Sequence, residues 1–153
     1  MPLRRRARGS LTDRWLRPVS LVPLPYALLM VLAPRARLTQ RVMADDRLFL
    51  AYAGAYTALL ARATRADPQG ALGILRLDTA AIARFIGDPD RGVITVWTHM
   101  TTSDLFIARW IYRDSLARGA VARLPILAQA LFGPLGLLLY LLTRRPRHDA
   151  QEP

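Results

Sequence analysis

The sequence predicts an all-α integral membrane protein, a bundle of four transmembrane helices with a short amphipathic interfacial helix between spans 2 and 3. Three observations support this fold class. Hydrophobic residues make up 52% of the 153 residues, which is above the usual level of soluble proteins. Four apolar segments lie along the chain, and one is uncharged over 19 residues. Only Arg109 falls inside an apolar run, and the other arginines lie at the ends of the runs or between and beyond them, as in membrane loops.

The first span, about residues 18–34, follows a basic N-terminal segment, residues 1–17, with six arginines. A basic start before an apolar run is also typical of a secretory signal peptide. However, Pro34 and Arg35 stand where a small-residue cleavage site would be required, and a second apolar segment follows. We therefore interpret the run as a retained span, whose several prolines should delay or kink the helix.

The second span is expected at about residues 45–62. It is the weakest of the four, because its uncharged core is shorter than the roughly 20 residues that a bilayer requires. Asp45 and Asp46 stand at its start, where the N-terminus of a helix favours acidic groups.

A helical pattern over residues 71–92 occupies the link between the second and third spans. Asp78 is expected to cap a helix here and Gly87 to end it. The segment is too short and too charged to cross a membrane, so we expect a helix that lies at the membrane surface or covers the bundle.

The third and fourth spans are expected at about residues 93–112 and 123–142. The fourth contains the 19-residue uncharged run and is the clearest transmembrane segment. Its Gly133–Pro134 pair should kink the helix, which neighbouring helices can accommodate. The kink serves either packing or the shaping of a cavity that faces the third span.

The four spans form one membrane domain, residues 18–143, and residues 144–153 make a polar C-terminal tail. Four spans place both termini on one side, which then carries 14 arginines against seven on the other. Because positive charge collects in the cytoplasm, we expect both termini to be cytoplasmic. The all-arginine composition and the basic tail indicate a bacterial inner (plasma) membrane. The net charge of +11 is thus assigned to loops, and nucleic acid is not expected as a partner.

Composition limits the available chemistry. No cysteine is present, which excludes disulfides, thiolate metal sites and cysteine nucleophiles. Of the two histidines, only His99 lies in an apolar segment, so a multi-histidine metal centre is excluded. A phosphate-binding glycine loop and a GxSxG nucleophile elbow are absent. We expect no metal and no cofactor.

The third span carries the candidate functional residues. On a helix His99 and Trp110 share one face, and Trp97 and Asp104 share the adjacent face. Charged groups inside a bilayer are costly, so Asp104 and Arg109 should face the bundle interior. Two interpretations stay open with similar weight: these residues fasten helices together, or they bind a ligand or take part in catalysis.

The chain contains LPYALLMVLAPRAR, WTHMTTSDLFIARWIYRDSLARG and LPILAQALFGPLGLLLYLL in this order. In this combination, over roughly residues 18–143, it resembles the ABA-deficient-four-like family of small four-span membrane proteins. The family's third-span pattern matches at Trp97, His99, Asp104, Leu105, Phe106, Arg109 and Trp110. Its fourth-span pattern matches at Leu124, Pro125, Phe132, Gly133, Pro134, Gly136 and Tyr140.

The resemblance implies a class of chemistry. The family is named for a plant plastid member needed to make neoxanthin from violaxanthin, formally an isomerisation that requires an acid and a base but no redox metal. By this analogy, the candidate catalytic residues are His99 and Asp104, and the ligand is an isoprenoid or carotenoid. The candidate binding residues are Trp97, Arg109, Trp110, Gly133 and Pro134.

Two function classes remain open. The first is a cofactor-independent, isomerase-like enzyme that acts on an isoprenoid or carotenoid. The second is a non-enzymatic membrane binding or scaffold subunit whose polar strip docks a partner helix or lipid. A small transporter or channel is less favoured, because inverted repeats are not visible and the few spans would require a homo-oligomer. Every interpretation requires the lipid bilayer as a partner.

Overall fold

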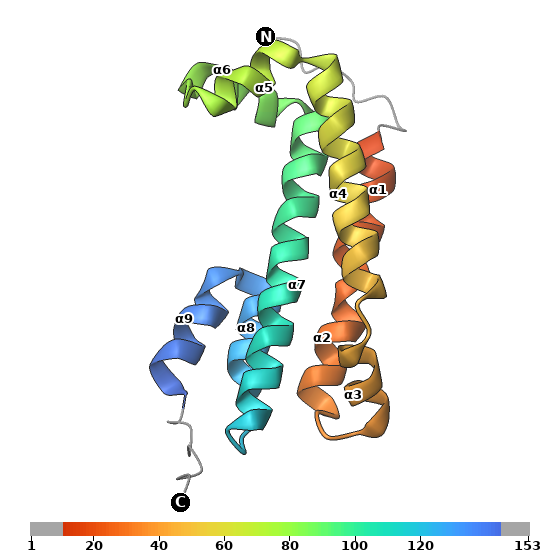
Figure 1. Ribbon diagram of the computed structural model, residues 1–153, viewed down its shortest axis with the longest axis vertical. Helices are drawn as coiled ribbons and strands as arrows, with labels where there is room; N and C mark the ends of the chain where they lie inside the picture. Colours follow the sequence, from red (N-terminus) through yellow and green to blue (C-terminus); the bar gives the residue numbers. More distant parts are fainter. Residues whose placement is uncertain (1–10, 145–153) are drawn as a thin grey trace, which may run out of the picture. The chain divides into compact units, whose positions relative to one another are not determined.

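The computed structural model describes residues 11–144, and the outer parts of the predicted N-terminal segment and C-terminal tail lie outside this range. In the described residues the chain forms helices and no strand, which confirms the all-α prediction (Figure 1). The elements are α1 (Leu11–Leu21), α2 (Pro23–Leu32), α3 (Arg37–Ala44), α4 (Arg47–Ala66), α5 (Pro68–Leu75), α6 (Thr79–Gly87), the π-helical turn η1 (Pro89–Val93), α7 (Ile94–Ala117), α8 (Arg123–Phe132) and α9 (Pro134–Thr143).

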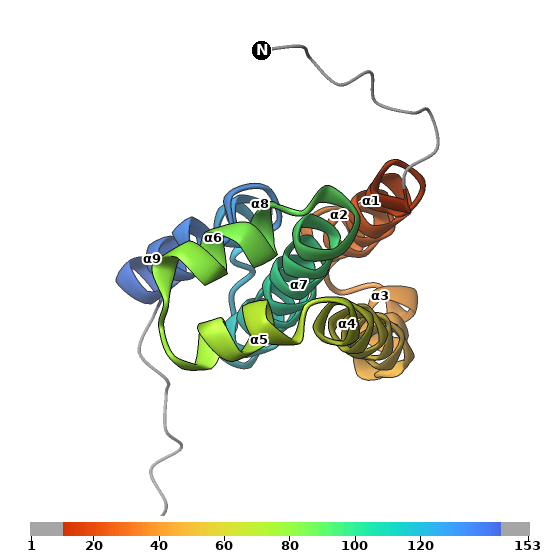
Figure 2. The same cartoon turned by 90° about the horizontal axis from the view of Figure 1, so that it is seen from above.

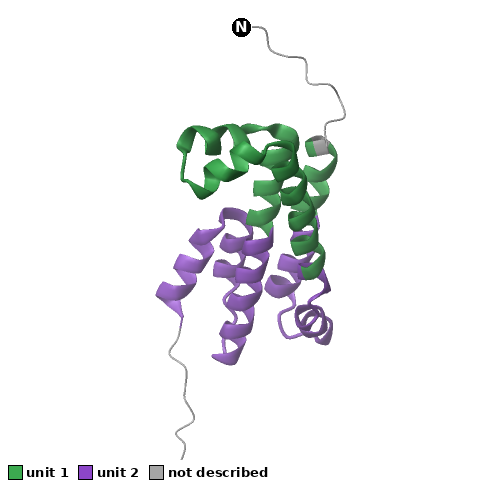
Figure 3. Ribbon diagram, turned by 45° about the horizontal axis from the view of Figure 1, so that its top comes forward, with its two compact units in different colours: residues 1–21, 50–101 green, residues 22–49, 102–153 purple. Residues whose placement is uncertain are grey.

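The chain divides into two compact units, which Figure 3 distinguishes by colour. Unit 1 contains residues 1–21 and 50–101, and unit 2 contains residues 22–49 and 102–153. Helices α4 and α7 each begin in one unit and end in the other. The two units are described separately below.

In unit 1, the predicted interfacial helix is a pair of short helices, α5 and α6, that lie side by side (Figure 2). The Asp78 carboxylate accepts hydrogen bonds from the backbone N–H groups of Ala80 and Ala81 at 3.0 and 3.2 Å, which confirms it as the N-cap of α6. Helix α6 ends at Gly87, as expected. The pairing with α5 depends on Gly73, where an added Cβ would collide with the side chain of Ala81. Periodicity cannot reveal such a close approach.

Long-range hydrogen bonds from Thr12, Val19 and Ser20 join the first helix of unit 1 to the rest of that unit. The Thr12 hydroxyl donates to the carbonyl oxygen of Pro89 at the start of η1. The hydroxyl of Tyr52, on α4, donates to the Val19 carbonyl at 2.8 Å. Near the start of α7, Trp97 Nε1 donates to the Ser20 hydroxyl at 2.9 Å. Helix α1 is therefore held through its polar groups.

In unit 2, the predicted fourth span is two helices, α8 and α9, that fold back on each other (Figure 1). Gly133, between them, has φ 59° and ψ −125°, a conformation that is readily accessible only to glycine. At Gly136 the backbone of α9 approaches α8 so closely that a Cβ would collide with the backbone of Gln129. The expected kink at Gly133 and Pro134 is thus a reversal of chain direction.

Each arm of this hairpin has ten residues, which gives about 15 Å of helix at 1.5 Å per residue. The hydrocarbon core of a bilayer is about 30 Å thick. Neither α8 nor α9 alone is therefore long enough to cross it.

The hairpin packs against α2 within unit 2. Met30 on α2 and Ile126 on α8 are fully buried. The hydroxyl of Tyr112 donates to the Pro34 carbonyl at 2.6 Å, and Arg123 Nε donates to the Val31 carbonyl at 3.0 Å. These bonds fix the turn after α2 against the end of α7 and the start of α8.

Within the described residues, one helical stretch is long and apolar enough to cross a membrane, namely Arg14–Leu32 with a mean hydropathy of 1.5. Only 17% of this stretch is buried, unlike the core helix of a soluble protein, although a signal sequence can have the same length and apolarity. Helices α8 and α9 are apolar but short, and α4 and α7 are long but not apolar enough. This is a weak indication of a membrane protein, and the four-span bundle stays a prediction.

Candidate functional site

The predicted polar strip on α7 divides between the two units. Trp97 and His99 belong to unit 1, whereas Asp104, Arg109 and Trp110 belong to unit 2. Each part has its own partners within its own unit, so the site is built separately for each.

His99 has an aromatic neighbour in unit 1. Its ring lies 5.1 Å from that of Tyr56 on α4, with an interplanar angle of 43°. The His99 side chain is exposed, and Trp97, which is 44% exposed, bonds to Ser20 as described above. These contacts join α7 to α4 and α1, and they leave the imidazole accessible.

Asp104 lies at the reversal between α8 and α9 in unit 2. Its Oδ1 accepts a hydrogen bond from Gln129 Nε2 at 2.8 Å. A Cβ built on Gly133 would lie 3.3 Å from Oδ1 and 3.5 Å from Oδ2, so the carboxylate is next to the glycine. The side chain is partly buried, and Oδ2 has no hydrogen-bond partner among the described residues.

Gln129 connects this carboxylate to the second arm of the hairpin. It is fully buried, and its Oε1 accepts from the backbone N–H of Leu137 at 2.9 Å. Pro134 is the first residue of α9, whose N-terminal end carries a partial positive charge. The amide, the glycine and the helix N-terminus together hold Asp104 in one place.

Arg109 forms an ion pair within unit 2. Its Nη1 lies 2.7 Å from Asp46 Oδ1, and the guanidinium lies 4.1 Å from the centroid of the Phe49 ring. The same nitrogen donates to the carbonyl oxygens of Met43 and Asp45 at 3.5 and 3.4 Å. The Arg109 side chain is 9% exposed and that of Asp46 is 68% exposed. The partner from another segment that this arginine requires is therefore Asp46, at the start of α4.

Trp110 packs against the hairpin. Its ring meets that of Tyr140, on α9, edge to face, with centroids 5.6 Å apart. The Tyr140 hydroxyl donates to Asp114 Oδ2 at 2.6 Å, and Arg118 Nε donates to the same oxygen at 2.7 Å. Trp110 thus contributes to helix packing beside a buried polar cluster.

Residues 17–140 match the family model described as ABA DEFICIENT 4-like. The chain belongs to the ABA DEFICIENT 4-like family. It is 25% identical over 124 residues to Protein ABA DEFICIENT 4, chloroplastic, of Arabidopsis thaliana, and the alignment covers 79% of this chain and 56% of the relative. The chain therefore spans only about half the length of that relative. No solved structure matches it.

Two polar residues of this ABA DEFICIENT 4-like chain were not predicted from the sequence. Gln129 bonds to Asp104, and Asp114 bonds to Tyr140 and Arg118. Gln129 was detectable, because it is the one amide in the 19-residue uncharged run. Asp114 gave no such signal, because it lies in the charged segment 112–119, where a carboxylate is not unusual.

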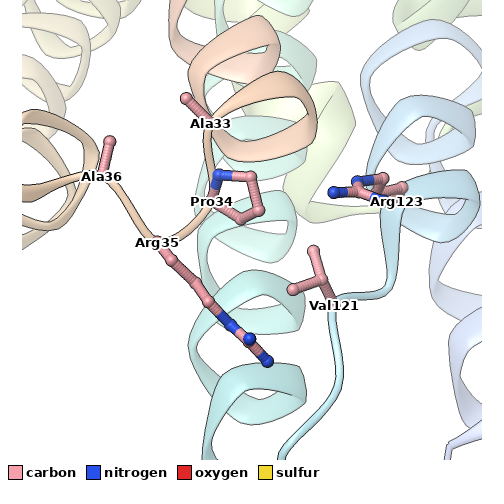
Figure 4. Close-up of a pocket in the computed structure, with 6 residues that line it drawn as sticks. All are labelled: Ala33, Pro34, Arg35, Ala36, Val121 and Arg123. Carbon is pink, nitrogen blue, oxygen red and sulfur yellow. The ribbon is translucent and has the colours of Figure 1, made fainter.

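Two neighbouring cavities of unit 2 lie away from Asp104. One, of about 490 Å³, is lined by Ala33, Pro34, Arg35, Ala36, Val121 and Arg123 (Figure 4). The other, of about 390 Å³, is lined by residues 120–125, by Ser115 and Arg118, and by Tyr140, Thr143 and Arg144. Neither His99 nor Asp104 lines either of them. In the described residues of this family member, no group of three or more His, Asp or Glu side chains could hold a metal ion.

Proposed function

We propose that this chain is an integral membrane protein that binds an isoprenoid or carotenoid and acts on it by acid–base chemistry without a redox step. One observation carries the proposal. Asp104 is held by a buried amide at a break between two apolar helices, and its second oxygen has no partner among the described residues. A carboxyl group that is fixed in position yet keeps one oxygen available is suited to proton transfer.

The chemistry that the family resemblance implies requires little else. When an epoxide isomerises to an alcohol, its oxygen gains a proton, a C–O bond breaks, and a neighbouring carbon loses a proton. The reaction is balanced without an oxidant or reductant. We assign the proton transfer at one of these positions to Asp104 and propose His99, whose ring is accessible in unit 1, for the other. The ligand class comes from the family resemblance alone.

Expression in carotenoid-producing cells tests the proposal. Extracts from cells with the wild type, Asp104→Asn and an empty vector are compared by chromatography. Asparagine keeps an oxygen that accepts from Gln129 but cannot exchange a proton, so conversion should fall about 100-fold or more. Asp78→Asn is the matched control: it changes an exposed carboxylate of unit 1, asparagine caps α6 as well as aspartate does, and the variant should convert as the wild type does. If the carotenoid profiles of the wild-type and empty-vector extracts were identical, the enzymatic proposal would be wrong.

A second candidate function is a non-enzymatic binding or scaffold subunit. The contacts of the α7 side chains favour this second function. Arg109 forms an ion pair with Asp46, and the Tyr112 hydroxyl donates a hydrogen bond to the Pro34 carbonyl. These contacts fasten helices together, as expected for polar groups in an apolar setting. This function predicts that Asp104→Asn alters co-purifying partners or pigment, while no small molecule is converted.

The membrane orientation follows from how many segments cross. Four crossings would place both termini in the cytoplasm, as the arginine count predicts. In unit 2, however, Arg144 after α9 and Arg123 at the start of α8 line the same cavity. We propose that α8 and α9 form a re-entrant hairpin, so that the C-terminal end returns to the side of the link before α8. The arginine count then becomes eleven against ten and no longer selects an orientation.

A further inference from the structure

We propose that the 490 Å³ cavity of unit 2 is a binding site for a phosphate-bearing anion. Its volume lies within the range of small-molecule pockets. Two segments far apart in sequence form its walls, the turn after α2 and the start of α8. Figure 4 shows Arg35 and Arg123 coming from these two walls, with Pro34 and Val121 drawn between them.

The charges that line this cavity are all positive. Arg35 and Arg123 are its two charged residues, and no carboxylate is among the lining residues. Neither arginine forms an ion pair with a carboxylate of the described residues, whereas Arg109 and Arg118 do. Arg123 uses its Nε for the Val31 carbonyl, and its two terminal nitrogens have no partner in the described part of the chain. Arginine in this state is suited to bind a phosphate.

The backbone acceptors around the cavity are already engaged. The carbonyl oxygen of Pro34 accepts from the Tyr112 hydroxyl at 2.6 Å, and that of Ala33 accepts from Thr39 Oγ1 at 2.7 Å. The Val121 carbonyl accepts from the backbone N–H of Arg123 at 3.0 Å. The groups that still lack a hydrogen-bond partner around the cavity are therefore donors. Such a site favours an anion with several acceptor oxygens over a cation.

Helix starts add to the positive potential. The N-cap residues of α3 and α8 are Ala36 and Ala122, and neither helix start has a side-chain cap. The first N–H groups of a helix lack intrahelical partners, and its N-terminus favours negative charge. Ala36 lines the cavity itself, and Arg123 is the first residue of α8.

The position of the cavity along the chain points to a lipid as one source of the phosphate. Pro34 ends the first apolar run, and Arg123 directly precedes the 19-residue uncharged run. Both therefore lie where polar headgroups begin if these runs enter the bilayer. This step rests on the membrane location proposed above, whereas the binding of a phosphate group does not.

Binding to the purified full-length protein tests the proposal. The protein is placed in nanodiscs of phosphatidylcholine that contain a fixed fraction of phosphatidylglycerol, and retained lipid is counted by native mass spectrometry. A second arm adds inorganic phosphate as competitor. The double variant Arg35→Gln/Arg123→Gln is compared with Arg41→Gln/Arg113→Gln, which removes two exposed arginines of the same unit that do not line the cavity.

We expect the wild type to retain phosphatidylglycerol in preference to phosphatidylcholine, and the cavity variant to bind it about tenfold more weakly or worse. The control variant should stay within about twofold of the wild type. Retention that phosphate does not displace identifies a lipid phosphate, and displacement identifies a site that also takes free phosphate; both support the proposal. Equal losses in both double variants, or a wild type that neither prefers phosphatidylglycerol nor binds inorganic phosphate, overturn it.

A single variant guards against a folding defect, because Arg123 also supports the Val31 carbonyl. Arg35→Gln alone removes an exposed side chain with no hydrogen bond in the described residues. It should weaken phosphatidylglycerol retention at least about threefold with an unchanged circular dichroism spectrum. Unchanged retention in this folded variant contradicts the proposal.

Discussion

Gln129 joins Asp104 to the backbone of α9. Its Nε2 donates to Asp104 Oδ1 at 2.8 Å, and its Oε1 accepts from the Leu137 N–H at 2.9 Å. One buried side chain thus links α7 with both arms of the α8–α9 hairpin. The Asp104 carboxylate and the chain reversal depend on the same amide, so variants that disturb one should disturb the other.

Gln129→Met should destabilise the protein by about 1–3 kcal/mol, because it leaves the Leu137 N–H and the Asp104 carboxylate without their partner while nearly keeping the side-chain volume. Thermal unfolding in detergent, followed by circular dichroism, measures the effect. Gln40→Met is the matched control, since Gln40 is exposed and its single bond to Arg35 is long at 3.4 Å. Equal melting temperatures for the two variants would show that the amide bridge contributes nothing.

Gly133→Ala should destabilise the hairpin by about 1–3 kcal/mol, because alanine is strained at φ 59°, ψ −125° and its Cβ would press on Asp104. Gly54→Ala should have the opposite sign. Gly54 lies within α4, with open space where a Cβ would go, so alanine should add up to about 1 kcal/mol of helix stability. The two melting temperatures should shift in opposite directions, and a shift in the same direction would contradict the argument.

The local structure was largely predictable from the sequence. Each apolar segment is helical, Asp78 caps α6, and α6 ends at Gly87, because these features depend on near neighbours in the chain. The reversal at Gly133 was not predictable in the same way. A Gly–Pro pair has the same local signature in a kink and in a turn, and the packing of Gly136 on α8 decides between them.

The residues of the site were easier to predict than their partners. Helical periodicity shows which face a side chain shares, but it does not show what that face meets. Asp104 bonds to a residue 25 positions away, and Arg109 to one 63 positions away. The sequence indicated that both side chains should face the interior of a bundle, and the packing of unit 2 shows that their partners are Gln129 and Asp46.

Arg109→Ala should cost about 2–4 kcal/mol, whereas Asp46→Asn should cost at most about 1 kcal/mol. The asymmetry arises because the arginine is buried, stacks on Phe49 and also bonds to two backbone carbonyls, while Asp46 is mostly exposed. A double-mutant cycle on melting curves isolates the ion pair itself. A cost for Asp46→Asn as large as that for Arg109→Ala would show that the ion pair dominates.

Unit 1 contains a pH-dependent pair at the start of η1. The hydrogen bond from Arg91 to Asp88, with Nε 3.0 Å from Oδ2, holds the pKa of that carboxyl below its usual 3.8. A depressed folded-state pKa stabilises the protein above the unfolded-state value, and this contribution is lost as the pH falls through the folded-state pKa. In Asp88→Asn, stability should therefore change less than in the wild type as the pH falls below about 4.

Arg91→Gln provides the matched test of this pair. It leaves the carboxyl in place but removes the cause of the low pKa, so its acid profile should approach that of Asp88→Asn. Melting temperatures between pH 2 and 6 measure the three profiles. If Arg91→Gln kept the full acid dependence of the wild type, Arg91 would not be its cause.

The re-entrant hairpin predicts which ends of the chain share a side of the membrane. The chain has no cysteine, so single-cysteine variants need no altered background. Leu38→Cys, Ala117→Cys, Thr143→Cys and Arg14→Cys each replace an exposed residue. In oriented vesicles treated with a membrane-impermeant maleimide, Thr143→Cys should react from the same side as Leu38→Cys and Ala117→Cys. Arg14→Cys should react from the other side, because three crossings separate the two ends. If Thr143→Cys and Arg14→Cys react from one side, the last segment crosses the bilayer and the four-span topology is correct.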